Sequence, residues 1–363
     1  MDYNINYNRI LIFDGSYCLH RNLSQPNQWE MINSKGKRTG GIFGTLRTIL
    51  KELKTYNFYP VVIFDGGLSK RRLDIYPNYK RNLDKQALME CKWEDLTIEE
   101  QLDAEFRKEY STQRNDLMEI LPLFGIPTIR IDGWEGDDLI YILSKLTKNS
   151  IVVSDDKDLI QLINKDPNRE CRIRRPLKDE FLNMNDLIAK NEDINTYIGT
   201  KCIVGDPSDN IPSACFQVGE KTAPGLYKLF ETCQRNGRIF PKDEKALDSI
   251  CKEFNIPKRK AYVNFDEDQF LINYLLTNLR FVDEELIEDN SILLKIYEAI
   301  NTSINCGRSH SEELNTILNN LEIKTFDSNG LFNRISALKD VINIEDEDKV
   351  NNLTEIFLNG RLF

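Results

Sequence analysis

Short apolar runs alternate with longer amphipathic stretches over the first half of the chain. Each run is three to five residues long, rich in Ile, Val or Phe and bounded by turn residues, as buried parallel strands are. These runs are residues 9–13, 60–64, 127–131 and 151–153, with a further strand expected at 171–175. Apolar positions at helical spacing predict helices between them, at 41–53, 116–124 and 138–146. The pattern predicts an α/β fold with a mostly parallel central sheet flanked by helices.

The remainder of the chain has a different pattern. Residues 67–115 are highly charged and too long for an ordinary strand–helix connection, so we expect a helical excursion or arch there. Beyond residue 210 the periodicity is helical. The helices predicted in that part are 221–230, 243–254, 267–278, 291–303, 311–321 and 331–342. We divide the chain into a core at 1–180 that includes the arch, a helical region at 181–290 and a helical extension at 291–363.

The charge balance bears on the kind of partner. The 363 residues include 48 Lys and Arg against 58 Asp and Glu, a net charge of −10. Taken alone, this acidity argues against nucleic acid, because phosphates repel it. The first 80 residues, however, have 12 basic and 6 acidic side chains, and the acidity is concentrated later. The net charge therefore does not exclude a nucleic-acid partner.

Several other protein classes are disfavoured. No run of about 18 apolar residues exists, so we expect no membrane span. The polar N-terminus lacks the features of a signal peptide, and the eight cysteines form no CxxC pair, which favours reduced thiols in a cytoplasm. With two histidines, His20 and His310, the chemistry of an enzyme would fall to carboxylates.

Acidic residues stand at the predicted strand ends and helix starts. They are Asp14, Asp65, Glu135, Asp137, Asp138, Asp156 and Asp158, followed by Asp206 and Asp209. Each one alone is explained as a turn or cap residue, and those in a first helical turn suit the helix dipole. Together they would meet beyond the carboxyl ends of the strands and repel one another unless cations neutralise them. Oxygen ligands without histidine select Mg²⁺ or Mn²⁺, and two such ions about 4 Å apart can promote phosphodiester cleavage.

The order of these motifs resembles that of the flap endonuclease and 5′→3′ exonuclease family, and within it most resembles the ribonuclease H of T-even phages. The matching segments are D-G at 14–15 and 65–66, EGDD at 135–138, SDDKDL at 154–159 and GDPSDNIP at 205–212. IYPNYKRN at 75–82 resembles the base of the family's helical arch, and VGEKTA at 218–223 resembles its helix–three-turn–helix motif. The resemblance implies a PIN-like nuclease core at 1–180 with an arch at about 67–115, and a helix–three-turn–helix region at 181–290.

The resemblance also implies roles for the carboxylates. Asp14, Asp65, Glu135 and one or both of Asp137 and Asp138 would hold a first Mg²⁺. A second Mg²⁺ would be served, directly or through water, by Asp156, Asp158, Asp206 and Asp209. Mn²⁺ would substitute for either ion. Asp155 lies outside the matched positions.

Basic residues of the same segments acquire roles by the same resemblance. Lys80 and Arg81 would steer the scissile phosphate, aided by Arg72 and by Tyr79, which would stack on an unpaired base; the alternative is that these are solvated helix charges. Gly219, Lys221 and Thr222 open a helix whose backbone N–H groups would grip duplex phosphates. Pro224 fits that helix if it lies in the first turn. Gly136 stands where the family often has alanine.

Two features stay open between a functional and a structural interpretation. The arginines of 169–175 form either a phosphate-facing strand or an exposed edge protected by charge. The C-terminal residues LTEIFLNGRLF form either a core-packing helix or a tail that docks on a sliding clamp.

These observations predict a monomeric, structure-specific, metal-dependent 5′-nuclease. It would cleave DNA or RNA–DNA duplexes at 5′ ends or flaps, leave a 5′-phosphate, and remove primers during replication and repair, with a sliding clamp or a single-strand-binding protein as further partners. Two alternatives are a PIN-type endoribonuclease acting on single strands and a catalytically silent DNA-binding adaptor of the replisome. The predicted arch argues against the first alternative, and the complete carboxylate set argues against the second.

Overall fold

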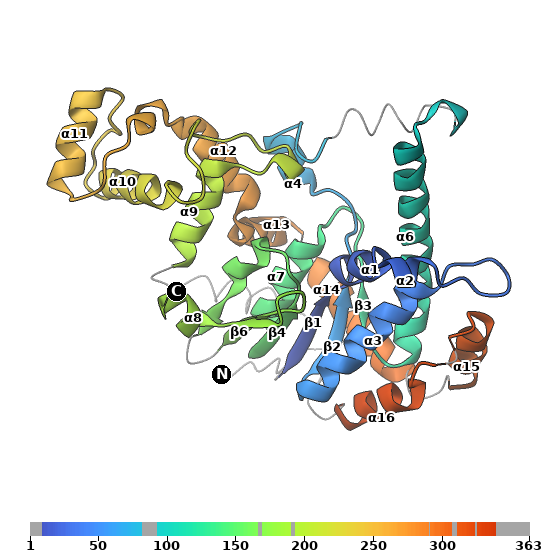
Figure 1. The fold of residues 1–363 in the computed structure, drawn as a ribbon. Helices are drawn as coiled ribbons and strands as arrows, with labels where there is room; N and C mark the ends of the chain where they lie inside the picture. The colour runs from blue at the N-terminus through green and yellow to red at the C-terminus, as the bar shows by residue number, and fades with distance from the viewer. Residues whose placement is uncertain are drawn as a thin grey trace. The chain divides into compact units, whose positions relative to one another are not determined.

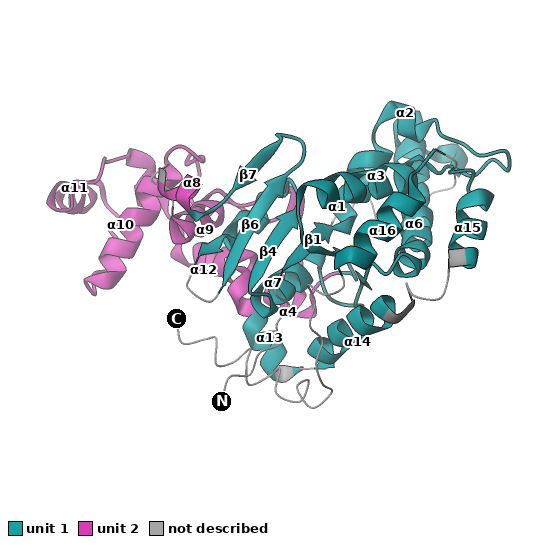
Figure 2. Ribbon diagram, turned by 90° about the horizontal axis from the view of Figure 1, so that it is seen from below, with its two compact units in different colours: residues 1–67, 86–184, 282–363 teal, residues 68–85, 185–281 magenta. Residues whose placement is uncertain are grey.

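The computed structural model describes residues 9–81, 93–165, 169–189, 193–289, 291–306, 311–323 and 325–338. The chain forms two compact units (Figure 2). Unit 1 consists of Met1–Gly67, Gln86–Met184 and Val282–Phe363, and unit 2 consists of Leu68–Lys85 and Asn185–Phe281. The division into three parts expected from the sequence stays a prediction.

A seven-stranded sheet forms the centre of unit 1 (Figure 1). Its order is β3-β2-β1-β4-β6-β5, with β7 paired to β6. The five strands from β3 to β6 run parallel, and β5 and β7 each pair antiparallel with β6. The strands are β1 (Ile10–Asp14), β2 (Tyr59–Ile63), β3 (Thr128–Ile129), β4 (Asn149–Val153), β5 (Asn164–Lys165), β6 (Glu170–Arg175) and β7 (Glu180–Leu182). The predicted α/β fold with a mostly parallel sheet is confirmed.

Buried apolar strands explain why helices cover this sheet. β1 and β2 are buried at every position, so both of their faces need apolar partners. Helix α7 packs against β1, β2 and β4, while α3 packs against α1 and β2. The helices of this part are α1 (Gly15–Leu23), α2 (Pro26–Trp29), α3 (Gly40–Thr55), α6 (Ile98–Leu123) and α7 (Gly136–Leu146).

Helix α6 is the longest helix in the described residues, with 26 residues, and occupies the second half of the predicted arch segment. A Thr97–Glu100 capping box fixes its start. Its buried side chains are confined to the C-terminal half, at Gln113, Leu117, Ile120 and Leu121. The N-terminal half therefore extends away from the core of unit 1 (Figure 1). Residues 82–92, also within the predicted arch, lie outside the described residues.

The C-terminal helices return to unit 1. Helix α14 packs against α6 and β3, α15 packs against α6, and α16 packs against α3 and β2. Their bounds are α13 (Val282–Glu288), α14 (Ser291–Cys306), α15 (Ser311–Asn320) and α16 (Ser328–Leu338). The C-terminal residues 353–363, which include the possible clamp-binding tail, lie outside the described residues.

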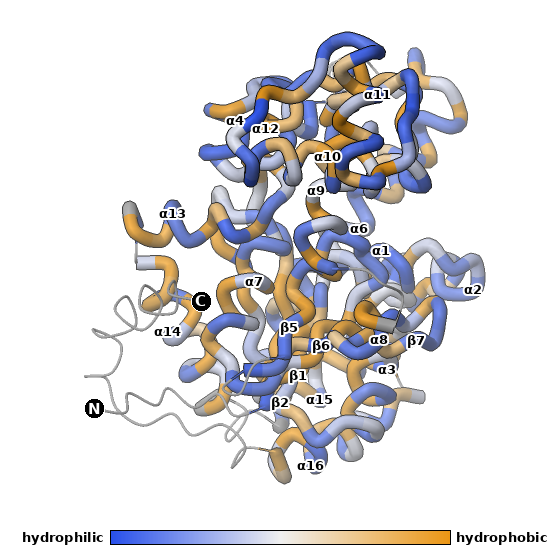
Figure 3. The backbone as a smooth tube through the Cα atoms, turned by 90° about the vertical axis from the view of Figure 1, so that its left-hand side faces the viewer, coloured by the Kyte–Doolittle hydropathy of each residue, from blue (hydrophilic) through white to orange (hydrophobic). Residues whose placement is uncertain are grey.

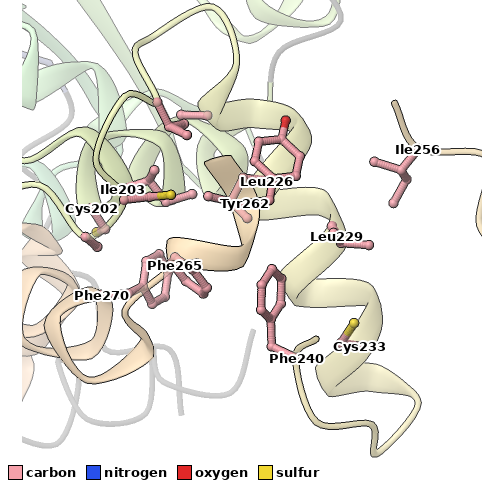
Figure 4. Close-up of a cluster of buried hydrophobic side chains, with 14 of the residues drawn as sticks. Cys202, Ile203, Leu226, Leu229, Cys233, Phe240, Ile256, Tyr262, Phe265 and Phe270 are labelled. Atoms are coloured by element: carbon pink, nitrogen blue, oxygen red, sulfur yellow. The ribbon is translucent and has the colours of Figure 1, made fainter. Parts of the chain in front are cut away.

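Unit 2 is helical. Its helices are α4 (Lys70–Ile75), α8 (Met184–Ala189, starting at the last residue of unit 1), α9 (Ile194–Val204), α10 (Ala223–Arg235), α11 (Glu244–Glu253) and α12 (Glu267–Thr277). Hydrophobic and hydrophilic positions are interleaved along α10 and α11 (Figure 3), as amphipathic helices require. Their apolar faces form a core in which Phe265 lies edge-to-face with Phe240 and Phe270 (Figure 4).

Short 3₁₀ helices complete the described structure, at Trp93–Asp95, Asp158–Leu162, Pro207–Asp209, Lys260–Asn264 and Leu279–Phe281. None of the helices within the described ranges combines the length and apolarity needed to cross a membrane. Six cysteines are free and buried: Cys18, Cys171, Cys202, Cys215, Cys233 and Cys251.

A buried ion pair links α3 to β6 and provides a test of the core of unit 1. Glu52 Oε2 lies 3.3 Å from Arg174 Nε, and the two residues are 2% and 6% exposed, respectively. Replacing Glu52 by alanine leaves a buried guanidinium with one partner fewer, so we expect Glu52→Ala to lower the free energy of unfolding by about 3 kcal/mol in urea denaturation. Asp103→Ala, which breaks an exposed pair with Arg107 on α6, should cost about 0.5 kcal/mol or less. Equal costs for the two variants would show that the Glu52 pair adds nothing to the core.

Candidate active site

Asp14 ends the central strand β1 and caps the helix that follows. Its Oδ1 accepts a hydrogen bond from the Tyr17 N–H at 2.9 Å, and its Oδ2 accepts one from Ser154 Oγ at 2.8 Å. The side chain is buried, with the residue 8% exposed. Two elements, the first turn of α1 and the end of β4, therefore hold this carboxylate in one orientation.

The surroundings of Asp14 oppose its ionisation. The pKa of Asp14 is raised to about 7, chiefly by burial and further by the negative charges of Asp65 and Asp156, although the hydrogen bonds from Tyr17 and Ser154 lower it. Carboxylates from three strand ends thus act on one another electrostatically, as the sequence predicts. Such an arrangement attracts a cation.

Asp65 follows β2 and is tied to two neighbouring elements. Its N–H donates to Ser16 Oγ at 3.1 Å, and its Oδ1 accepts from the Gly136 N–H at 2.7 Å. A Cβ atom on Gly136 would lie 2.9 Å from that same Oδ1. The glycine that stands where the family often has alanine thus leaves room for the Asp65 carboxylate at the start of α7.

The acidic residues of α7 occupy its N-terminal turn. Glu135 is the N-cap and is 4% exposed, Asp138 is fully buried and Asp137 is half-buried. Glu135 and Asp138 are three residues apart and so share a face, as expected. Their position also suits the helix dipole, which stabilises negative charge at a helix start.

The segment after β4 separates two kinds of aspartate. Asp156 accepts from the Asp158 N–H at 2.8 Å, and its own N–H donates to Ser154 Oγ at 3.0 Å. Asp155 instead accepts from the Tyr17 hydroxyl and from the Leu177 N–H. Its carboxylate is therefore used within the fold, in agreement with its place outside the matched positions.

The donor chemistry of these residues fits a hard divalent cation, because every predicted ligand offers oxygen. Their present arrangement is looser than a finished site: among the described residues, no three or more Asp, Glu, His or Cys side chains stand in a geometry that could hold a metal ion.

Two residues near the carboxylates were not anticipated. Ser154 joins Asp14 to the Asp156 backbone, and its place directly after β4 was a usable signal. Tyr110 of α6 forms a side-chain hydrogen bond with Ser16; burial raises its pKa to about 12, and the charges of Asp65 and Asp14 act in the same direction. No local pattern marks Tyr110, because its proximity arises from the packing of α6.

Asp206 and Asp209 belong to unit 2. Asp206 caps a 3₁₀ turn, accepting from the Ser208 N–H at 2.9 Å, and lies 3.9 Å from Lys201 Nζ. Burial opposes the shift, but these hydrogen bonds and the Lys201 charge hold the pKa of Asp206 below its ordinary value. Asp209 Oδ2 lies 3.7 Å from Lys80 Nζ. That Asp206 and Asp209 bind a second metal ion, directly or through water, stays a prediction.

The arch-base residues also belong to unit 2. Lys80 is partly exposed and Arg81 is exposed, so both side chains reach solvent. Arg72 and Tyr79 are each 3% exposed; Arg72 Nε donates to the Leu276 carbonyl, and Tyr79 packs with Leu276. This burial favours an internal part for both side chains over the contacts with nucleic acid expected from the sequence.

The predicted duplex-binding turn precedes α10. Gly219 and Lys221 are exposed and Thr222 is half-buried, and the N–H of Thr222 donates to the Gly219 carbonyl at 2.9 Å. The helix begins at Ala223, which places Pro224 in its first turn as expected. Whether this turn holds phosphates stays a prediction.

Two arginines of β6, Arg174 and Arg175, fit neither interpretation offered for the arginines of 169–175. Arg174 and Arg175 are 6% and 7% exposed and pair with acidic side chains within unit 1. Arg172 is stacked over the Phe58 and Phe181 rings. Arg172 is half-buried, whereas Arg174 and Arg175 belong to the interior of the fold, which neither a phosphate-facing strand nor an exposed edge describes.

Comparisons with known proteins agree with this arrangement. Residues 9–192 match the family model of the 5'-3' exonuclease, N-terminal resolvase-like domain. A 5'-3' exonuclease of Buchnera aphidicola is 27% identical over 317 residues, covering 82% of this chain and 96% of that protein.

Two solved structures are similar in fold. The T5 5'-exonuclease with bound zinc ions has a TM-score of 0.57 at 20% identity, over 81% of this chain and 99% of that one. A flap endonuclease of bacteriophage T5, described as a pseudo-enzyme-product complex with DNA and metal ions, has a TM-score of 0.55 at 19% identity, over 81% and 98%.

The raised pKa of Asp14 predicts a pH-dependent cost in the metal-free protein. Because the unfolded carboxyl ionises near pH 3.8 and the folded one near 7, the folded state binds more protons between these values, and stability falls as the pH rises through this window. In EDTA, Asp14→Asn should therefore melt about 3 °C or more above the parent at pH 8 and within about 1 °C of it at pH 4. Melting curves at both values give the comparison. A difference independent of pH would contradict the assigned cause.

Proposed function

The chain belongs to the 5'-3' exonuclease family, and from this premise we propose that it is a structure-specific 5′-nuclease driven by divalent cations. The observation that supports this most directly is the mutual effect of Asp14, Asp65 and Asp156. These side chains lie at the ends of separate strands of one sheet, and a cation bound among them would neutralise their repulsion at the place where the chemistry is expected.

We assign the cation site of unit 1 to oxygen ligands. The proposed ligands are Asp14, Asp65, Glu135, Asp137, Asp138, Asp156 and Asp158. Bound Mg²⁺, two ions in our proposal with Mn²⁺ as a substitute, would lower the pKa of a water and stabilise the leaving oxygen. The chain's own part is to orient these oxygens: Ser154 and the first turn of α1 fix Asp14, and the N-terminus of α7 fixes Asp65.

The substrate is a DNA or RNA–DNA duplex with a 5′ end or a 5′ flap, and cleavage leaves a 5′-phosphate. The T5 flap endonuclease described with DNA and metal ions supports this substrate class. Lys80 and Arg81 are proposed to contact the scissile phosphate, and both are open to solvent. Gly219, Lys221 and Thr222 are proposed to hold the duplex through phosphates, without reading its sequence.

We place this activity in primer and flap removal during DNA replication, inside a cytoplasm. The six free cysteines suit a reducing compartment.

Removing a proposed ligand should abolish cleavage. Asp14→Ala and Asp156→Ala should each slow single-turnover cleavage of a labelled 5′-flap duplex in Mg²⁺ by about 10²-fold or more, because metal catalysis supplies several kcal/mol. EDTA should stop cleavage by the parent protein. Asp132→Ala removes an exposed carboxylate that pairs with Arg130 and is the matched control. Full activity in both site variants would refute the assignment, and faster cleavage of linear single-stranded RNA than of the flap would favour an endoribonuclease.

Lys80 should matter more for the chemical step than for binding. We expect Lys80→Ala to slow single-turnover cleavage by about 10²-fold. The substitution removes a positive charge that would stabilise the negative charge developing on the phosphate in the transition state. The Kd for the flap duplex in EDTA should change by about threefold or less, because one cation among several phosphate contacts is lost. Lys70→Ala, at an exposed lysine of the same segment, is the control. Equal losses in rate and affinity would make Lys80 an ordinary phosphate contact.

A further inference from the structure

The Asn210 side chain lies against the turn that presents Lys80. Within unit 2, its Nδ2 donates to the Asn78 carbonyl at 2.9 Å and reaches the Arg81 carbonyl at 3.5 Å. The Lys80 N–H donates to the carbonyl of Asp209, the residue before Asn210, at 2.9 Å. A single amide and its neighbouring peptide thus hold both ends and the centre of the 78–81 turn.

The backbone of this turn needs such support. Lys80 has a φ of 51°, in the left-handed region that lysine seldom adopts and that persists where neighbouring groups hold it. Asn210 itself has a φ of 59°, a conformation that asparagine tolerates well. Asn210, which holds the turn, is therefore in a backbone conformation that suits its residue type, whereas Lys80, which is held, is not.

The Lys80 side chain is placed as a consequence. Its Nζ lies 3.7 Å from Asp209 Oδ2 and 5.3 Å from the centre of the Tyr79 ring. Tyr79 is buried, so this ring provides a fixed surface beneath the ammonium group. A lysine otherwise spreads over many rotamers, and confining it removes that entropy before a phosphate arrives.

We propose that Asn210 is a positioning residue for Lys80, acting through the 78–81 turn. The inference rests on the proposed contact of Lys80 with the scissile phosphate. It assigns a role to the asparagine of the GDPSDN segment, which metal binding by carboxylates does not explain. Asn210 is a neutral amide donor that fixes a cation at the base of the predicted arch.

A double-mutant cycle tests the coupling. Asn210→Gly keeps the left-handed backbone and removes the donor, and Asn210→Asp keeps the size and turns an acceptor toward the Asn78 carbonyl. Each should slow single-turnover cleavage of a 5′-flap duplex in Mg²⁺ by about tenfold, as expected for a catalytic group displaced by a fraction of an ångström. The Kd in EDTA should change by less than about twofold. In a Lys80→Ala background, Asn210→Gly should cause no further loss.

A second readout does not depend on cleavage. Hydrogen exchange of the peptide containing residues 76–81 should accelerate in Asn210→Gly, because its clamp is lost. Asn255→Gly is the matched control: Asn255 is an exposed left-handed asparagine of unit 2, with a φ of 52°, at the end of α11. It should alter neither the exchange of 76–81 nor the cleavage rate.

The outcomes separate the inference from the proposed function. If Lys80→Ala cleaves as fast as the parent, the proposed role of Lys80 fails and the inference fails with it. If Lys80→Ala is slow but Asn210→Gly cleaves normally, the inference alone is overturned. A full additional loss from Asn210→Gly in the Lys80→Ala background would also overturn it, because Asn210 would then act on another group.

Discussion

Parallel strands bring the residues at their carboxyl ends to one edge of a sheet, and at the ends of β1, β2 and β4 these residues include Asp14, Asp65 and Asp156. Asp14 shows the consequence: it is held in place by two hydrogen bonds, is buried, and is close enough to Asp65 and Asp156 for their charges to oppose its ionisation. The fold therefore places mutually repelling carboxylates at one edge of unit 1. A divalent cation bound there would relieve the repulsion, and the contacts around this edge orient the carboxylates for such a cation.

The supporting contacts come from small or neutral groups. Ser154 donates to Asp14 and accepts from the Asp156 backbone, and Ser16 accepts from the Asp65 backbone. Gly136 gives the Asp65 carboxylate a backbone donor and the space to reach it. None of these groups adds charge, so they orient oxygens without competing with an ion. Cations such as Arg174 are buried elsewhere in unit 1 and paired there with other acids.

The sequence predicted the elements whose periodicity is strong and the acids at their ends. The five parallel strands, α7 and most later helices lie within a few residues of expectation, because a buried strand must be apolar and must stop at a turn. Contacts made through tertiary packing were out of reach. Tyr110 meets Ser16 because α6 packs on α1, and Tyr79 is buried by Leu276, which lies nearly 200 residues further along the chain. The cluster of arginines at 169–175 likewise suggested an exposed strand, but Arg174 and Arg175 are buried and paired with acidic side chains of other segments.

The most direct test of the central claim is Mn²⁺ binding followed by electron paramagnetic resonance, without nucleic acid. The account predicts that the parent protein removes free Mn²⁺ from solution and that Asp14→Ala loses most of this binding, whereas Asp132→Ala, at an exposed carboxylate, keeps it. Equal Mn²⁺ binding by the parent protein and Asp14→Ala would contradict the claim that the edge carboxylates form the cation site.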